Sequence, residues 1–74
     1  MSAVKKRSVS INGHRTSYSI EDEFQIALEK IAASRALSLA RLIAEVDSVP
    51  RTIGGLSSAL RVFVLNHATA ASQG

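Results

Sequence analysis

The dipeptide Asn12-Gly13 lies between two short runs in which apolar and polar side chains alternate. An Asn-Gly pair in this setting is the strongest local signal for a two-residue β-hairpin turn. Alternation with a period of two is typical of strands that bury one face. The sequence therefore predicts strands over residues 8–11 and 15–20, with Val9 opposite Thr16. The apolar face of this hairpin would consist of Val9, Ile11, Thr16, Tyr18 and Ile20.

From Glu21 onward the apolar residues recur at intervals of three and four, which is typical of amphipathic helices. This spacing predicts three helices, over residues 21–34, 38–46 and 56–67. Residues 47–55 contain the only proline and a glycine pair, so they predict a loop. The order of elements predicts a single α+β, mostly helical domain over residues 1–74, with a frayed end after residue 67.

Serines mark the starts of the second and third predicted helices. Ser38 is the expected N-cap of the second helix, and Ser57 or Ser58 that of the third. A serine hydroxyl at this position accepts a hydrogen bond from one of the first free amides of the helix. The third helix is expected to cover the core with Leu60, Phe63 and Val64.

The chain has 74 residues, of which 46% are hydrophobic. A domain of this size buries only about 60% of its extended surface. This high proportion of apolar side chains therefore favours burial against a partner subunit. The absence of cysteine excludes disulfides and thiolate metal sites. Apolar runs are far shorter than the roughly 20 residues that span a bilayer, and no signal peptide is recognisable. We therefore expect a cytoplasmic, oligomeric domain without membrane association.

Charge is unevenly distributed along the chain, which has a net charge of +3 at pH 7. Residues 1–20 hold four basic residues and no acidic one, whereas residues 21–30 hold four acidic residues against Lys30. A basic segment beside an acidic block indicates a surface that faces a polyanion. The competing interpretation is a basic tail that only keeps the chain in solution.

Residues that could carry catalysis are not grouped in this sequence. His14 and His67 are the only histidines, and neither has the spacing to a carboxylate or a second histidine that a metal site needs. The acidic residues 21–23 are explained by the first turn of a helix, where carboxylates complement the helix dipole. No glycine-rich phosphate loop is present. We predict a protein that is not an enzyme and that needs no metal or cofactor.

The outer face of the strand over residues 15–20 presents Arg15, Ser17 and Ser19 at alternate positions. A two-stranded ribbon fits the major groove of B-DNA, where arginine can bind guanine and serine can donate or accept. A polar strand, a helix, a short turn and a helix that opens on a serine follow over residues 15–46 (RTSYSI–EDEFQIALEKIAAS–RALS–LARLIAEV). This order resembles the ribbon-helix-helix family of DNA-binding proteins. With the third helix, the chain is similar to a bacterial subgroup of predicted regulators.

The resemblance implies an obligate, intertwined homodimer in which each chain contributes one strand to an antiparallel ribbon. Arg15, Ser17 and Ser19 would read the bases. Helix amides bind phosphate well, and Arg41 stands where a glutamate would repel it. Contacts to the DNA backbone are expected from Lys5, Lys6, Arg7, Leu37, Ser38, Leu39 and Arg41. The core shared between subunits would consist of Tyr18, Ile20, Phe24, Leu28, Ile31, Leu39, Leu42, Ile43 and Val46.

Two hypotheses for function follow from these observations. The first is a homodimeric bacterial transcriptional regulator, a repressor associated with the nucleoid, that inserts its ribbon into double-stranded DNA and forms dimers or higher oligomers there. The second is a dimeric interaction module, an antitoxin or adaptor, whose third helix binds a protein. Residues 1–14 are either an additional strand or a mobile basic arm. If they form a strand, the dimer has a four-stranded sheet, which is broad for a groove about 12 Å wide.

Overall fold

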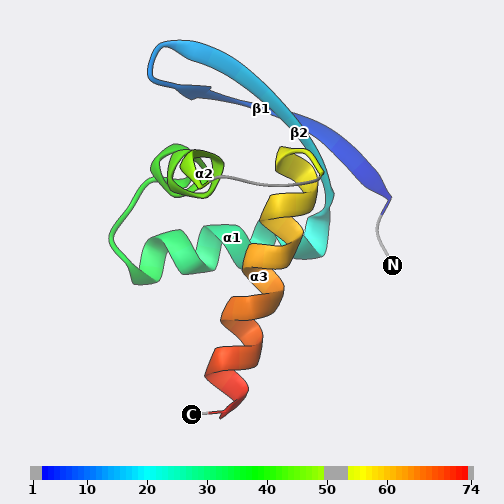
Figure 1. Ribbon diagram of the computed structural model, residues 1–74, viewed down its shortest axis with the longest axis vertical. Helices are drawn as coiled ribbons and strands as arrows, with labels where there is room; N and C mark the ends of the chain where they lie inside the picture. Colours follow the sequence, from blue (N-terminus) through cyan, green and yellow to red (C-terminus); the bar gives the residue numbers. More distant parts are fainter. Residues whose placement is uncertain (1–2, 50–53, 74) are drawn as a thin grey trace.

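The computed structural model describes residues 3–49 and 54–73, in which a β-hairpin precedes three helices (Figure 1). This arrangement confirms the predicted α+β, mostly helical fold with an additional C-terminal helix. The strands are β1 (Val4–Ile11) and β2 (His14–Glu21), and the helices are α1 (Asp22–Ser34), α2 (Leu39–Ser48) and α3 (Leu56–Gln73).

The hairpin turns at Asn12 and Gly13, whose φ angles of 51° and 80° are those of a type I′ turn. The register places Val9 opposite Thr16, as predicted, and continues to Val4 opposite Glu21. The first segment is therefore a strand from Val4 onward and not an arm. Residues 1–2 lie outside the described part of the chain.

Helix α1 ends in a Schellman motif that the sequence did not reveal. The amide of Leu37 donates to the carbonyl oxygen of Ala32 at 2.9 Å, and that of Ala36 donates to Ala33 at 3.1 Å. Ala36 has a φ of 56°, the left-handed conformation that this motif requires. The chain reverses within these few residues, and Ser38 then caps α2, as predicted.

The core lies between the hairpin and the three helices. Of the nine predicted core residues, seven are buried, whereas Phe24 and Leu39 are partly buried at its margin. Leu60 of α3 is fully buried, with Phe63 and Val64 packed beside it, so α3 covers the core as predicted. A single chain thus encloses these side chains, because α3 adds the apolar surface that the hairpin and the first two helices lack. The buried residues are Tyr18, Ile20, Leu28, Ile31, Ala32, Leu42, Ile43, Val46 and Leu60.

Two boundaries of α3 differ from the prediction. The helix begins at Leu56, so neither Ser57 nor Ser58 is its N-cap. It continues beyond His67 to Gln73, since the segment is rich in alanine and contains no proline or glycine before residue 74. The predicted loop over residues 47–55 begins later, because α2 includes Asp47 and Ser48; residues 50–53 lie outside the described residues.

Candidate nucleic-acid interface

Between the turn and Glu21, the face of the hairpin that points away from the helices carries six polar side chains, which we call the polar ribbon face. The register pairs Ser10 with Arg15, Ser8 with Ser17, and Lys6 with Ser19, and directly opposed residues share a face. Five of the six residues are exposed, and Ser19 is half-buried. The polar ribbon face consists of Lys6, Ser8, Ser10, Arg15, Ser17 and Ser19.

Three of these residues, Arg15, Ser17 and Ser19, were predicted as base-reading residues, and the structure brings them together on β2. Ser8 and Ser10 on β1 were not among the candidates. The Asn12-Gly13 turn could have indicated them, because a two-residue loop fixes which residues of the two strands share a face. The interface thus spans two strands, whereas the predicted base-reading residues lie on one.

The polar ribbon face has a positive electrostatic character. Lys6 and Arg15 lie on it, and no acidic residue occurs in β1 or in β2 before Glu21. The four serines add hydroxyl groups that both donate and accept hydrogen bonds. Such a surface is suited to a polyanion whose exposed edges carry donors and acceptors.

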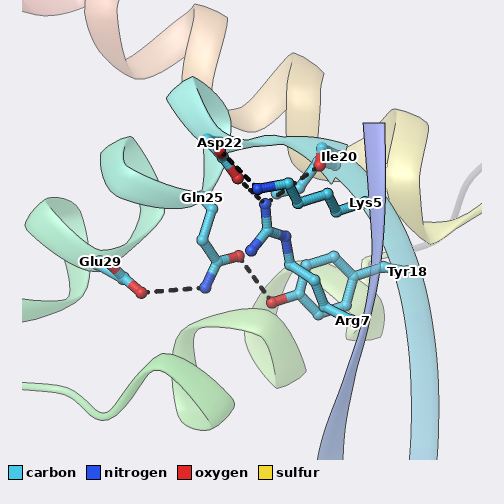
Figure 2. A network of polar contacts seen from close by, with 7 residues as sticks. All are labelled: Lys5, Arg7, Tyr18, Ile20, Asp22, Gln25 and Glu29. Atoms are coloured by element: carbon cyan, nitrogen blue, oxygen red, sulfur yellow. Dashed lines mark hydrogen bonds and ion pairs between the residues drawn. The ribbon is translucent and has the colours of Figure 1, made fainter. Parts of the chain in front are cut away.

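Lys5 and Arg7 lie on the opposite face of β1, which separates them from Lys6. Figure 2 shows both side chains directed at Asp22, the first residue of α1. Lys5 Nζ lies 3.0 Å from Asp22 Oδ2, and Arg7 Nη2 lies 2.7 Å from Asp22 Oδ1. The Arg7 side chain is only 21% exposed, and it also donates to the carbonyl oxygen of Ile20 at 3.4 Å. The structure therefore gives these two predicted phosphate contacts a place between the hairpin and α1.

The hydrogen bond from Arg7, followed by that from Lys5, holds the pKa of Asp22 below its ordinary value. Beside this ion pair, the Tyr18 hydroxyl donates to Gln25 Oε1 at 2.9 Å, and Gln25 Nε2 donates to Glu29 at 3.1 Å (Figure 2). Burial raises the pKa of Tyr18. Both sets of contacts join the hairpin to α1, so they fix the direction in which the polar ribbon face points.

Ser19 is held by α3 through its main chain. Its amide donates to Ser57 Oγ at 2.8 Å, and Arg61 Nη2 donates to its carbonyl oxygen at 3.2 Å. Arg61 Nε also donates to Glu21 Oε1 at 3.1 Å. The sequence does not reveal Ser57 and Arg61 as partners of the ribbon, because no local pattern connects residues about forty positions apart.

The start of α2 contains the second predicted group of contacts, Leu37, Ser38, Leu39 and Arg41. Ser38 Oγ accepts a hydrogen bond from the Arg41 amide at 3.1 Å, and the Arg41 side chain is exposed. The first turn contains no acidic residue. The amides and dipole of a helix start favour an anion there, so the geometry is compatible with a phosphate contact.

Neither a metal centre nor a membrane span emerges from the part of the chain that the structure describes. Within residues 3–49 and 54–73, no three histidine, cysteine, aspartate or glutamate residues are grouped so that they could hold a metal ion. Among the same residues, no helix has the length and apolar character needed to cross a bilayer.

A basic, serine-rich β-hairpin followed by a pair of helices and a covering third helix defines a small α+β protein with a ribbon that faces solvent. The family model described as "Ribbon-helix-helix domain" matches residues 4–68. The chain belongs to the ribbon-helix-helix family, whose members are DNA-binding transcription regulators. Searches of curated proteins and of solved structures found no match.

Proposed function

We propose that this chain is a homodimeric, sequence-specific DNA-binding protein that represses transcription on the bacterial nucleoid, in the cytoplasm. The observation that carries the proposal is the polar ribbon face. It combines Lys6 and Arg15 with four serines on the side of the hairpin opposite the core. The carboxylate next along this face, that of Glu21 at the end of β2, is paired with Arg61. Its chemistry suits phosphates and base edges.

The dimer forms through the edge of β2 that β1 does not occupy. Around Arg15 and Ser17, β2 is an edge strand, and unpaired backbone groups on such an edge are a template for another strand. Pairing of two β2 strands about a two-fold axis gives a four-stranded sheet in the order β1-β2-β2-β1. The polar ribbon faces of the two chains then form one continuous surface.

The width of this sheet assigns different roles to its strands. Neighbouring strands are about 4.8 Å apart, so each β2 lies about 2.4 Å from the two-fold axis and each β1 about 7 Å from it. The major groove is about 12 Å wide, or about 6 Å on each side of its centre. The two β2 strands therefore enter the groove with Arg15 and Ser17, whereas Lys6 on β1 lies over the phosphates. Ser19, half-buried by α3, lies at the margin of the base contacts.

The remaining predicted phosphate contacts divide into two groups. The start of α2, with Leu37, Ser38 and Leu39, offers its amides to a phosphate, and Arg41 adds a charge beside them. Lys5 and Arg7 instead hold Asp22 and orient the hairpin, so their effect on binding is indirect. No cofactor or effector enters the proposal.

The alternative, a protein partner on α3, has less surface available to it. Leu60, Phe63 and Val64 pack against the core. A partner would have to use the opposite side of the helix, where Val62 and Leu65 are 51% and 62% exposed. These two side chains lack the charge pattern that the polar ribbon face has, which is why we propose DNA as the main partner.

The test is fluorescence anisotropy with purified protein and labelled duplex DNA across a range of salt concentrations. A duplex of mixed sequence measures general affinity, and a preferred duplex is selected from a random pool with the unmodified protein. Arg15→Ala is expected to lose about 1–3 kcal/mol on the preferred duplex, because a bidentate arginine–guanine pair contributes this much discrimination. Arg15→Lys keeps the charge but loses the planar guanidinium group. Compared with Arg15→Ala, it should therefore bind the mixed-sequence duplex more tightly but show no greater preference for the selected duplex.

Three results would argue against the proposal. Absence of binding to either duplex at low salt would exclude DNA as the partner. An equal loss for Arg15→Ala on both duplexes would make Arg15 a phosphate contact. A random pool that yields no preferred sequence would remove sequence-specific readout while leaving DNA binding.

A further inference from the structure

The outer edge of β2 is occupied by α3 at one residue. The Ser19 amide donates to Ser57 Oγ at 2.8 Å, and the Ser19 carbonyl oxygen accepts from Arg61 Nη2 at 3.2 Å. Both backbone groups of Ser19 therefore point away from β1. These are the groups that a neighbouring strand would use.

The first turns of α3 are held firmly in this place. Arg61 Nε donates to Glu21 Oε1 at 3.1 Å, and the Arg61 guanidinium lies 6.0 Å from the centre of the Phe24 ring. Leu60, the neighbouring residue, is fully buried in the core. A second strand could reach Ser19 only if these contacts were broken.

The free part of the edge is consequently short. Backbone groups alternate between the two edges of a strand, so the N–H and C=O groups of Arg15 and Ser17 point the same way as those of Ser19. With Ser19 bound by α3, the segment from His14 to Ser17 is what β2 offers to another chain. Arg15 and Ser17 supply its donors and acceptors.

Antiparallel pairing of two β2 strands about a two-fold axis can centre on Arg15, Thr16 or Ser17. A centre at Arg15 would place two like charges directly opposite each other, which is destabilising, so two registers remain. In one register, the two Ser17 residues face each other across the two-fold axis, and Arg15 must exchange hydrogen bonds with Ser19 of the partner copy. In the other register, the two Thr16 residues face each other across the axis, and Arg15 exchanges hydrogen bonds with Ser17 of the partner copy. Only the second register leaves the contacts of Ser19 with Ser57 and Arg61 intact.

We propose that the first turns of α3 act as a register stop for strand pairing between two copies of this chain, so that the dimer is centred on Thr16. This inference rests on the proposed homodimer. In this register the Asn12-Gly13 turn of one copy falls beside Ser19 of the other, so each strand ends where α3 blocks the edge. The stop is built from Ser57 and Arg61.

The register determines how far apart the two Arg15 side chains lie. With the axis at Thr16, the two Arg15 residues are diagonal neighbours about 8 Å apart. With the axis at Ser17, they would be about 14 Å apart. The register stop therefore sets the spacing of the two base contacts in the operator.

Disulfide cross-linking distinguishes the two registers, and the chain contains no cysteine of its own. In the Thr16 register, the two Thr16 residues face each other in a non-hydrogen-bonded pair with Cα atoms about 4.5 Å apart, which is within disulfide range. Ser17 residues are then about 8 Å apart and outside that range. The variants Thr16→Cys and Ser17→Cys are oxidised at equal concentration, with and without DNA, and resolved on denaturing gels without reductant.

We expect Thr16→Cys to shift to the covalent dimer and Ser17→Cys to remain monomeric. The combination Ser57→Ala with Arg61→Ala removes the stop, and in this background Ser17→Cys should gain the dimer band. Circular dichroism and thermal unfolding of the combined variant confirm that it is folded. Ser57→Ala alone serves as the milder version if the combination does not fold.

Each contrary pattern overturns the inference. Cross-linking of Ser17→Cys but not of Thr16→Cys in the unmodified background would mean that α3 yields to the partner strand. An unchanged pattern after removal of Ser57 and Arg61 would exclude them as the stop. Cross-linking of neither variant, in a protein that binds DNA, would exclude both registers and leave the proposed DNA binding standing. Cross-linking of Thr16→Cys in a protein that does not bind DNA would support the Thr16 register and exclude the proposed DNA binding.

Discussion

Arg7 of β1 and Asp22 of α1 form an ion pair in which Nη2 lies 2.7 Å from Oδ1, although fourteen residues and a complete strand separate them in sequence. The pair joins the middle of β1 to the first turn of the helix that follows the hairpin. Because the polar ribbon face lies on the other side of the same strands, this contact orients the face relative to the helices. The ion pair is therefore a structural part of the interface without lying on it.

Replacement of Asp22 by asparagine should change how stability depends on pH. Arg7, and then Lys5, lower the pKa of Asp22 in the folded protein below its ordinary value of 3.8. The ionised carboxylate therefore contributes stability above about pH 4, and this contribution is lost as the pH falls through the lowered folded pKa. Urea unfolding from neutral to acidic pH should show unmodified protein losing stability below pH 4 more steeply than Asp22→Asn.

Glu45→Gln is the control for this comparison, because the Glu45 carboxylate lies 3.8 Å from Arg35 and both side chains are nearly half exposed. Below pH 4, the free energy of unfolding of Glu45→Gln should fall about as steeply as that of the unmodified protein. If Asp22→Asn and the unmodified protein lose stability in parallel below pH 4, the ion pair does not contribute as argued.

Ala36→Gly should stabilise the protein. Ala36 has a φ of 56°, a left-handed conformation that costs a residue with a Cβ atom about 1–2 kcal/mol and costs glycine almost nothing. Part of this gain is offset by the greater freedom of glycine in the unfolded chain. We expect the free energy of unfolding to rise by about 1 kcal/mol in urea titrations.

The matched control for Ala36→Gly is Ala33→Gly, three residues earlier in α1, where the backbone is helical and the side chain is exposed. The same substitution there should lower the free energy of unfolding by about 1 kcal/mol. Two changes of the same sign would contradict the assignment of the Schellman motif.

Leu60→Ala should destabilise the protein strongly, because α3 closes the core with this residue. The Leu60 side chain is fully buried, and loss of a buried leucine typically costs about 2–5 kcal/mol. Leu65→Ala on the same helix is the control, since Leu65 is 62% exposed and its loss should change stability by less than about 0.5 kcal/mol. Similar effects of the two substitutions would mean that α3 does not pack as described.

Local signals in the sequence predicted most of the fold. Asn12-Gly13 fixed the hairpin and its register, and Ser38 fixed the start of α2, because both depend on residues within a few positions of each other. The predicted readers Arg15 and Ser17 lie exposed on one face for the same reason. Hydrophobic periodicity and turn-forming residues depend only on neighbours in the sequence, so they can be recognised without a structure.

The features that were missed depend on contacts between distant parts of the chain or on an unusual residue. The bond from Ser19 to Ser57 spans 38 residues, and no pattern in either segment indicates it. The separation of Lys5 and Arg7 from Lys6 follows from strand alternation, but the strand was predicted only from residue 8, and β1 begins at Val4. Ala36 adopts a conformation that usually marks a glycine, so the end of α1 could not be recognised from residue type.

The single tyrosine, Tyr18, should titrate above its ordinary value of 10.0 in the folded protein, because burial raises its pKa. A raised folded pKa means that the neutral phenol contributes stability that is lost as the pH rises through that pKa. The chain has no tryptophan, so tyrosinate absorbance reports this group directly. In urea the midpoint should fall to the ordinary value, and an identical midpoint in both states would exclude a buried Tyr18.

Lys6→Ala should reduce the salt dependence of DNA binding more than its sequence preference. Lys6 is exposed on the polar ribbon face, and the proposed sheet places it over the phosphates. Each phosphate contact that is lost should flatten the slope of log K against log salt by about 1. Lys30→Ala is the control of equal charge, because Lys30 lies on α1 near His67 of α3 and away from the hairpin. If anisotropy titrations show that both variants flatten the slope equally, the effect comes from the net charge of the molecule and not from a phosphate contact of Lys6. If Lys6→Ala instead loses sequence preference, β1 lies inside the groove.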